Sequence, residues 1–303
     1  MRAAVCTLGN ISIDDLVFAD GSTQWCIPGG NAIYSALGAA LWQHRPVVMA
    51  PVGPDYPTDV LQERLDLSRC PRVPRTLRNW GLYEDDGSRS FIFRRDTRKW
   101  EEFSPTLADL DGFVCDAAHL APLRWELQIA IAERLRADGT RLISVDPDDR
   151  YLSALSPETV GRLLSDIDLF LPSRQDVEAL FPGRSPLDAL RRLRAAAPEL
   201  PAIAIKCGAK GVIIHAADDA DYFELPAIAG HVVDATGAGD AFSGGALVGY
   251  AATRSVIEAA LWGSVSASFA VEATGPAQLI AATKECAQSR LAQLRARIST
   301  HPL

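Results

Sequence analysis

The most informative part of the chain is VVDATGAGDAFSGG, residues 232–245. An apolar, strand-like run leads into a glycine-rich turn, and the residues from Ala238 onward are typical of a helix. At the N-terminus of a helix the first main-chain N–H groups lack partners and carry partial positive charge. Gly237 and Gly239 keep side chains away from these groups, so the pattern predicts an anion site suited to a phosphate.

Asp240 follows the second glycine, at the edge of the predicted anion site. Taken alone, a carboxylate in the first turn of a helix is explained by stabilisation of that helix, by about 0.3–1 kcal/mol. Phosphoryl transfer, however, needs donors for the transferring group beside a base for the attacking hydroxyl. Residues 237–240 supply both, which favours a catalytic role for Asp240.

Two other glycine motifs do not fit this stretch. A P-loop requires GxxxxGK followed by Ser or Thr, and the chain contains no such run. A dinucleotide-binding fingerprint lies early in a βαβ unit and needs a third glycine or alanine, where this chain has Phe242. The stretch therefore indicates a different kind of phosphate site.

The composition narrows the class of protein. The net charge of −8 over 303 residues argues against nucleic acid or an anionic membrane as a partner. The six cysteines form no CxxC pair and no zinc spacing, so we expect reduced thiols. The N-terminus lacks a signal-peptide pattern, and no apolar run approaches the roughly 18 residues of a membrane span. We therefore expect a cytoplasmic protein.

Strand-like and helix-like segments alternate along most of the chain, which predicts a mostly parallel sheet with helices on both faces. Strands are expected at residues 3–8, 46–50, 118–121, 141–145, 169–171, 202–206, 211–215 and 222–225. Helices are expected at residues 31–43, 58–67, 125–137, 157–165, 174–181, 186–197, 238–252, 255–271 and 279–298.

Two hairpins interrupt this alternation, one around Asp20-Gly21 and one around Asp85-Asp86-Gly87. They are either decorative edge strands or a small lid sheet. We favour the lid, because phosphoryl transfer requires a site from which water is excluded. We expect one α/β domain over residues 1–303, with lid strands at about 11–27 and 80–95 inserted in it.

DATGAGD, residues 234–240, resembles the second signature of the ribokinase (PfkB-type) carbohydrate kinase family. PGGNA, residues 28–32, resembles the first, diglycine signature, and the resemblance extends in the same order over essentially the whole chain. It implies a ribokinase-like three-layer α/β/α sandwich with a mostly parallel central sheet and a small β-sheet lid. It also implies a phosphotransferase with an alcohol group as acceptor, using ATP and Mg²⁺.

The resemblance assigns roles around the second signature. Asp240 would be the general base. The main-chain N–H groups that would stabilise the transferring phosphoryl belong to Gly237, Ala238 and Gly239. Asp234 and the carbonyl of Thr236 match positions that hold a monovalent cation such as K⁺ in many relatives. The alternative for Asp234 is a turn residue before the helix.

The resemblance also implies an acceptor site. Its residues are Asn10, Asp14, Gly29, Gly30 and Asn31. The two glycines would let a substrate approach the backbone. Asp14 matches a position that accepts hydrogen bonds from substrate hydroxyls, or else it is a solvated hairpin residue. Tyr34 stands where relatives often have asparagine, so its ring would stack on a sugar or a base, or belong to the core.

The nucleotide side departs further from the pattern. The residues that match nucleotide-binding positions are Ser173, Asp176, Lys206, Gly208, Gly211, Ser264 and Ser268. Ser173 and Asp176 replace an Asn-x-x-Glu pair but keep oxygen atoms that suit Mg²⁺ and its waters. The turn after Lys206 would otherwise be an ordinary β-turn. Asp148 stands where asparagine is common.

The sequence leaves three functions open. The first is a sugar or sugar-derivative kinase, the second a nucleoside kinase on the same fold, and the third a non-catalytic ligand-binding relative. The intact Asp240 and glycines argue against the third. In the lid, Arg94 or Arg95 would clamp an anion or lie on a solvated edge. Phe91 and Phe93 would suit either a homodimer formed through the lid or the inner face of the lid.

Overall fold

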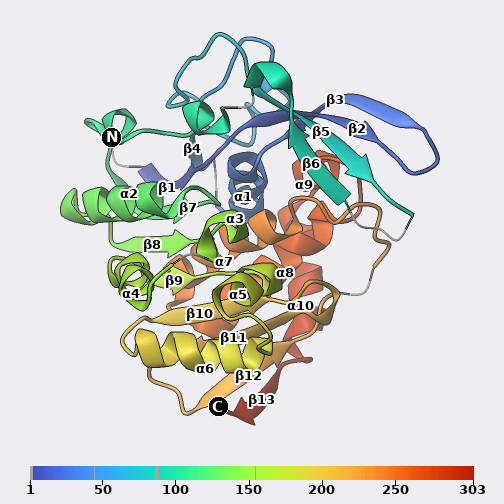
Figure 1. Ribbon diagram of the computed structural model, residues 1–303. Coiled ribbons are helices and arrows are strands. Elements are labelled where there is room, and N and C mark those ends of the chain that lie inside the picture. The colour runs from blue at the N-terminus through green and yellow to red at the C-terminus, as the bar shows by residue number, and fades with distance from the viewer. Residues whose placement is uncertain (1–2, 44, 86–88, 98, 154, 229) are drawn as a thin grey trace.

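The computed structural model describes residues 3–43, 45–85, 89–97, 99–153, 155–228 and 230–303, and it contains two β-sheets (Figure 1). In spatial order, the larger sheet consists of β13 (Ser299–Pro302), β12 (Asp221–Leu225), β11 (Val212–Ala216), β10 (Ala202–Lys206), β9 (Leu169–Phe170), β8 (Leu142–Val145), β7 (Cys115–Leu120), β1 (Ala3–Leu8) and β4 (Val47–Met49). The smaller sheet consists of β3 (Thr23–Gly29), β2 (Ser12–Val17), β5 (Leu77–Tyr83) and β6 (Arg89–Phe93).

The central sheet is parallel from β4 to β10 and antiparallel from β10 to β13. Its inner strands are apolar and buried on both faces, as expected when helices cover a parallel sheet. The register places Leu8 beside Leu120 and Leu120 beside Val145. The carboxyl ends of these strands therefore meet at one edge, which is where ligands bind in open α/β sheets.

Helices pack against both faces of this sheet and form a three-layer α/β/α sandwich (Figure 1). One face carries α1 (Asn31–Ala40), α7 (Ala238–Thr253), α8 (Val256–Ala270), α9 (Ala277–Ala281) and α10 (Lys284–Arg295). The other carries α2 (Trp125–Ala137), α4 (Pro157–Ser165), α5 (Arg174–Leu180) and α6 (Pro186–Ala196). Within the described ranges, no helix is both long and apolar enough to cross a bilayer.

Short helical segments complete the fold. The α-helix α3 (Asp149–Leu152) follows β8, and 3₁₀ turns occupy Thr58–Val60, Arg95–Thr97, Trp100–Phe103, Leu107–Leu110 and Gly208–Lys210.

The four-stranded sheet is the expected lid. Strands β2 and β3 form the first hairpin and β5 and β6 the second, and β2 pairs in parallel with β5 to join them. The sheet projects beside the carboxyl edge of the central sheet (Figure 1). Asp86 and Gly87, in the predicted turn of the second hairpin, lie outside the described residues.

Two local predictions are wrong, and one strand was not predicted. The helix expected at residues 58–67 is only the 3₁₀ turn Thr58–Val60, because the main chain of Asp66 instead pairs with the edge beside β4, Val48 N–H donating to the Asp66 carbonyl. The helix expected at residues 279–298 is divided, since Thr283 caps the start of α10 with its hydroxyl. Strand β13 was not predicted, and it pairs with β12.

Helices α1 and α7 approach each other through glycine. A Cβ at Gly244 would overlap the carbonyl oxygen of Ser35, and a Cβ at Gly38 would overlap the carbonyl of Ala241. The main chains of the two helices are therefore in direct contact.

We predict opposite effects of the same substitution at two helical glycines. Gly244→Ala should lower the free energy of unfolding by about 1–3 kcal/mol, because the added methyl group overfills the contact with α1. Gly161→Ala in α4, where nothing lies within 4 Å of the new methyl group, should raise it by roughly 0.5–1 kcal/mol. Urea denaturation measures both. Equal effects at the two positions would contradict the close contact between α1 and α7.

Candidate active site

Four ionisable side chains converge at the carboxyl edge of the central sheet. Asp146 follows β8, Lys206 ends β10, Asp176 lies in the first turn of α5, and Asp240 lies in the first turn of α7. The Lys206 ammonium donates to Asp146 and, at 3.3 Å, to the hydroxyl of Ser243. Lys206 also acts to lower the pKa of Asp176 and Asp240. One cation therefore favours the ionised forms of three carboxyl groups, and it is bonded to one of them, Asp146.

The glycine turn and the start of α7 are as the sequence predicts, but the strand-like run expected before them is wrong: residues 232–236 form no strand, and Val232 and Val233 are exposed. Gly237 takes the left-handed conformation, with φ of 76°, and is the cap residue. The N–H of Ala238 donates to the Ala235 carbonyl at 3.3 Å. The N–H groups of Gly237 and Gly239 find no acceptor in the described chain. A Cβ at Gly239 would lie 3.5 Å from Lys206 Nζ, so the ammonium lies beside these open amides. The arrangement suits an anion.

The carboxyl group of Asp240 has a strongly raised pKa. Burial raises the pKa of its carboxyl to about 8; the charges of Asp146 and Asp176 act in the same direction, while Lys206 acts against them. A base with a pKa near the working pH is effective in proton transfer. The charge around Asp240 is therefore appropriate for taking a proton from a hydroxyl.

The Ser173–Asp176 pair forms a capping box at the start of α5. The Ser173 hydroxyl accepts from the Asp176 N–H at 3.2 Å, and the Asp176 carboxylate accepts from the Ser173 N–H at 2.6 Å. Burial raises the pKa of Asp176 to about 7, and the charge of Asp146 adds to this effect. The pair therefore fixes a buried carboxyl within the cluster, which is more than a helix cap alone requires.

The turn after Lys206 contains the other two predicted glycines. Gly208 and Gly211 both have positive φ, 59° and 92°. A Cβ at Gly211 would overlap the Leu225 carbonyl of the neighbouring strand. The geometry of the chain itself thus requires Gly211, whether or not a nucleotide binds there.

Asp14 lies on the lid strand β2 and is buried at 7% exposure. Asn79 Nδ2, on the neighbouring strand β5, donates to its carboxylate at 2.9 Å. A Cβ at Gly29 would overlap the same carboxylate, so the diglycine turn passes directly beside Asp14. Burial raises the pKa of Asp14 to about 6. Asp14 is therefore not a solvated hairpin residue, and it lies against the first signature.

A hydrogen bond fastens the lid to the loop before α7. The Tyr83 hydroxyl, at the end of β5, donates to Asp234 Oδ2 at 2.8 Å and lies 3.1 Å from the Thr236 hydroxyl. Asp234 is buried and also accepts from the Thr236 N–H at 2.9 Å. The lid therefore touches the second signature directly, and the two signatures face one interior.

Most of the chain is similar in sequence to known proteins. The profile of the pfkB family carbohydrate kinases matches residues 4–282. The chain belongs to this family. It is 29% identical over 258 residues to a cytidine kinase of Thermococcus kodakarensis, covering 83% of this chain and 90% of that protein. It is 25% identical over 265 residues to a nucleoside kinase of Methanocaldococcus jannaschii, covering 82% and 80% of the two chains.

Solved structures show the same fold. The M. jannaschii nucleoside kinase, described as an archaeal member of the ribokinase family, superposes with a TM-score of 0.74 at 23% identity, covering 96% of this chain and 99% of that one. A Vibrio cholerae fructokinase bound to fructose, ADP and calcium ion gives a TM-score of 0.74 at 19% identity, with 95% and 99% covered. The prediction of a ribokinase-like sandwich with a lid is confirmed, and the chain is a family phosphotransferase.

Tyr34 stands where relatives often have asparagine, and the structure explains this difference. Its side chain is only 3% exposed, and a Cβ at Gly237 would overlap its ring. Of the three interpretations of Tyr34, the structure supports a core residue beneath the start of α7. The ring also explains why position 237 has to be glycine.

The residues of the first signature, expected to bind the acceptor, make contacts within the protein itself. Asn31 accepts from the Asn10 N–H at 2.7 Å and donates to the Pro122 carbonyl. The Asn10 amide donates to the Phe103 carbonyl and to Ser104. Gly30 has φ of 106°, and a Cβ there would overlap the Asn10 carbonyl. The close approach at Gly30 is thus made by the protein's own backbone.

On α8, Ser264 and Ser268 differ. Ser268 donates to the Val265 carbonyl and accepts from Arg290 at 2.8 Å, so its hydroxyl joins α8 to α10. Ser264 is half-buried within α8, and its hydroxyl makes no hydrogen bond to another described residue.

Asp146 belongs to the charged cluster of the candidate site, although the sequence pattern singled out Asp148. Asp148 caps α3 and pairs with Arg150, at 2.5 Å from carboxylate to guanidinium. Asp146 instead accepts from Lys206 and, at 3.0 Å, from Ser243. The signal was available, because Asp146 is the first residue beyond β8, where a parallel sheet presents its ligands.

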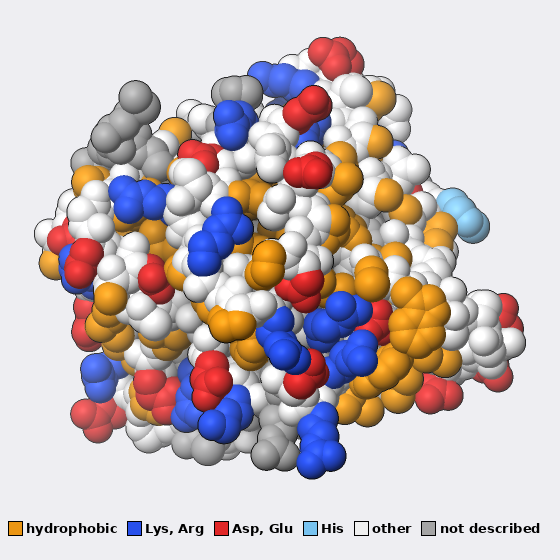
Figure 2. Space-filling view, turned by 90° about the horizontal axis from the view of Figure 1, so that it is seen from above, with side chains coloured by type: hydrophobic (Ala, Val, Ile, Leu, Met, Phe, Trp, Pro, Cys, Tyr) orange, Lys and Arg blue, Asp and Glu red, His pale blue; other side chains and the backbone are white. Residues whose placement is uncertain are grey.

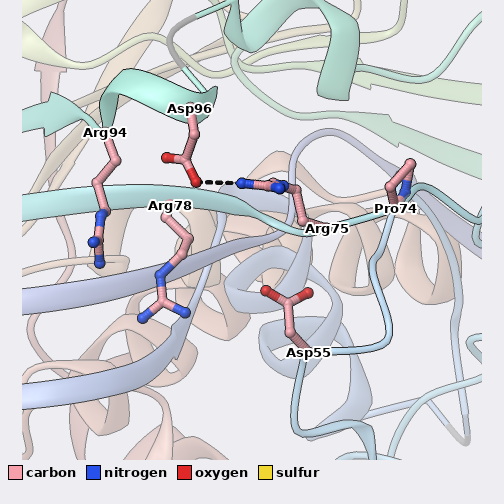
Figure 3. Close-up of a pocket in the computed structure, with 6 residues that line it drawn as sticks. All are labelled: Asp55, Pro74, Arg75, Arg78, Arg94 and Asp96. Carbon is pink, nitrogen blue, oxygen red and sulfur yellow. Dashed lines mark hydrogen bonds and ion pairs between the residues drawn. The ribbon is translucent and has the colours of Figure 1, made fainter.

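The lid arginines form a separate feature on the other side of β5. Arg78 and Arg94 both pair with the buried Asp15, at 3.1 and 2.6 Å, and Arg94 lies over the ring of Trp80. A cavity of about 390 Å³ lies here, and Figure 3 shows the guanidinium groups lining it. Seen from above, basic side chains gather beside hydrophobic ones at the lid end of the molecule (Figure 2). Arg94 is thus engaged with Asp15.

We predict that Tyr83→Phe loosens the lid. The substitution removes the hydrogen bond to the Asp234 carboxylate, and the half-buried setting limits the loss to about 1.4 kcal/mol. Amide hydrogen exchange in β5 should accelerate about tenfold, while the core strand β7 is unchanged. Tyr250→Phe, near the far end of α7, is the matched control. Unchanged exchange in β5 would show that the contact does not hold the lid.

Proposed function

We propose that this protein is an ATP-dependent kinase that transfers the γ-phosphate to a hydroxyl of a sugar or sugar derivative, with Asp240 as the general base. The observation that carries the proposal is the position of Asp240 beside open main-chain N–H groups and the Lys206 ammonium. A base and an anion site side by side are what in-line transfer to a hydroxyl requires. Membership of the pfkB family supports it.

In the proposed reaction, Asp240 accepts the proton of the acceptor hydroxyl as its oxygen attacks the γ-phosphorus. The new O–P bond forms while the bond from that phosphorus to the bridging oxygen of ADP breaks, so ADP leaves with the electron pair. The N–H groups of Gly237 and Gly239, with Lys206, stabilise the negative charge on the transferring group. Tyr83 holds the lid over the site and limits hydrolysis.

The residues present fit a magnesium ion carried by ATP. Mg²⁺ usually keeps several waters and takes one or two protein carboxylates together with phosphate oxygens. Asp176 supplies a buried carboxylate at the nucleotide side, and no group of three or more His, Cys, Asp or Glu forms a cage in the described ranges. We propose Asp176 as the ligand, through water. The ion would neutralise part of the negative charge on the phosphate groups of ATP.

We propose that a monovalent cation binds between the Asp234 carboxylate and the Thr236 carbonyl. Both groups present oxygen atoms, which hard cations prefer as ligands. Tyr83 and the Thr236 N–H already occupy part of the Asp234 carboxylate, so a cation would share that group with the lid.

A nucleoside kinase is the second candidate. The observation that favours it is similarity to relatives named cytidine kinase and nucleoside kinase, which covers more than four fifths of this chain in each case. The two candidates share one chemistry, because each phosphorylates a sugar hydroxyl. Tyr34 does not favour a base, since its ring is buried under Gly237.

We also propose one α/β domain, a cytoplasmic location and a homodimer formed through the lid. The six free cysteines suit a reducing compartment. Trp25, Phe91 and Ile92 expose 56%, 39% and 52% of their surface on the lid, which suits burial against a second copy.

We predict that Asp240→Asn lowers kcat by about 10²- to 10⁴-fold, because the amide cannot take the proton. Binding of ATP, measured by calorimetry, should be preserved. Asp188→Asn is a matched control, since Asp188 occupies the same third position in α6 away from the site. Turnover close to that of the unmodified enzyme in Asp240→Asn would exclude Asp240 as the base.

The raised pKa of Asp240 gives a second prediction. The base works only when ionised, so kcat/KM should rise with pH and level off above about 8, where the carboxyl is deprotonated in the free enzyme. Below pH 8 it should fall about tenfold per unit. A profile from pH 5.5 to 9.5 with a fixed acceptor measures this. A flat profile between pH 6 and 9 would contradict a base with this pKa.

A further inference from the structure

Asn79 is a buried polar side chain with an unused acceptor. It lies on β5 directly beside Asp14 of β2 in the register of the lid, and only 8% of its surface is exposed. Its Nδ2 donates to Asp14, but its Oδ1 has no hydrogen-bond partner in the described chain. A buried acceptor left without a donor costs about 1–3 kcal/mol, and native structures contain few of them.

The orientation of the Asn79 amide follows from Asp14. An ionised carboxylate only accepts hydrogen bonds, so the amide has to turn its NH₂ group toward Asp14. The reverse orientation would place two acceptor oxygens against each other. Asn79 Oδ1 is therefore held pointing away from Asp14, and the group that satisfies it has to be a donor from outside the described chain.

The surroundings identify the kind of donor. Asp14 lies beside Gly29 of the diglycine turn, where the acceptor substrate is expected. The carboxylate and Asn79 Oδ1 are two acceptors on adjacent strands, joined by one hydrogen bond of 2.9 Å. A pair of neighbouring hydroxyls supplies two donors at comparable spacing. A cation is less suited to this place, because the Asn79 NH₂ group already faces the carboxylate.

We propose that Asn79 determines acceptor specificity: its Oδ1 accepts a hydrogen bond from one hydroxyl of a vicinal diol, while Asp14 accepts from the other. This inference rests on the proposed kinase function. The diol belongs to a free sugar or to the ribose of a nucleoside, and both present the same chemistry. A buried acceptor left unpaired disfavours the deoxy analogue, so the enzyme should discriminate strongly between the two.

The test compares hydroxyl preference in three variants and the unmodified enzyme. The acceptors are D-ribose with 2-deoxy-D-ribose, and cytidine with 2′-deoxycytidine and 3′-deoxycytidine. Asn79→Ala removes the acceptor, and Asn79→Leu does so with little change in volume. Ser90→Ala, an exposed position on β6 of the same lid, is the control. Thermal melting identifies any variant that fails to fold. If one Asn79 variant does not fold, the other is enough for the comparison.

We expect the unmodified enzyme and Ser90→Ala to favour the diol over one deoxy analogue by about 100-fold or more in kcat/KM. In the Asn79 variants that ratio should fall to less than about tenfold, because the diol loses a partner and the deoxy analogue does not. The inference is overturned if the ratio is unchanged, or if both acceptors lose activity equally, as a structural role predicts. If the unmodified enzyme phosphorylates no acceptor in the panel, this inference fails for ribose-type diols; the proposed kinase function fails only if a wider panel of sugars and sugar derivatives also gives no ADP release.

Discussion

The contact between the Tyr34 ring and Gly237 is the constraint on which the candidate active site depends. It joins the helix that follows the first signature to the turn that opens α7. Because the ring fills the space that a side chain would need, position 237 is restricted to glycine and takes its left-handed conformation. The start of α7, with its open amides and Asp240, is thereby set at a fixed place above the sheet.

The electrostatics of the site follow from this placement. Asp146, Asp176 and Asp240 are brought to one edge by β8, α5 and α7, and Lys206 is the cation among them. Burial favours the protonated acids, while the ammonium favours their ionised forms. The resulting pKa of about 8 for Asp240 differs from that of an ordinary aspartate because of burial first and the two neighbouring acids second. A site arranged in this way is adapted to bind added negative charge beside a base.

The sequence predicts what is encoded locally and misses what long-range contacts decide. The glycine turn before Asp240, the lid hairpins and most strands follow from short patterns. The contacts of Tyr83 with Asp234 and of Asn79 with Asp14 span 151 and 65 residues, so no local pattern reveals them. Residues 58–67 have helical periodicity, yet most of them form no helix, because the main chain of Asp66 is hydrogen-bonded to Pro46 and Val48. Gly29, Gly30 and Gly237 were predicted correctly as special positions, but protein atoms, as well as any ligand, require them.

The central claim is that the start of α7 receives the γ-phosphate while Asp240 faces the acceptor hydroxyl. A crystal structure with a non-hydrolysable ATP analogue, Mg²⁺ and a bound acceptor tests it most directly. We predict γ-phosphate oxygens within about 3 Å of the Gly239 N–H and of Lys206 Nζ, and an acceptor hydroxyl within about 3 Å of the Asp240 carboxylate. A γ-phosphate bound away from these groups, or an Asp240 carboxylate with no hydroxyl against it, would contradict the account.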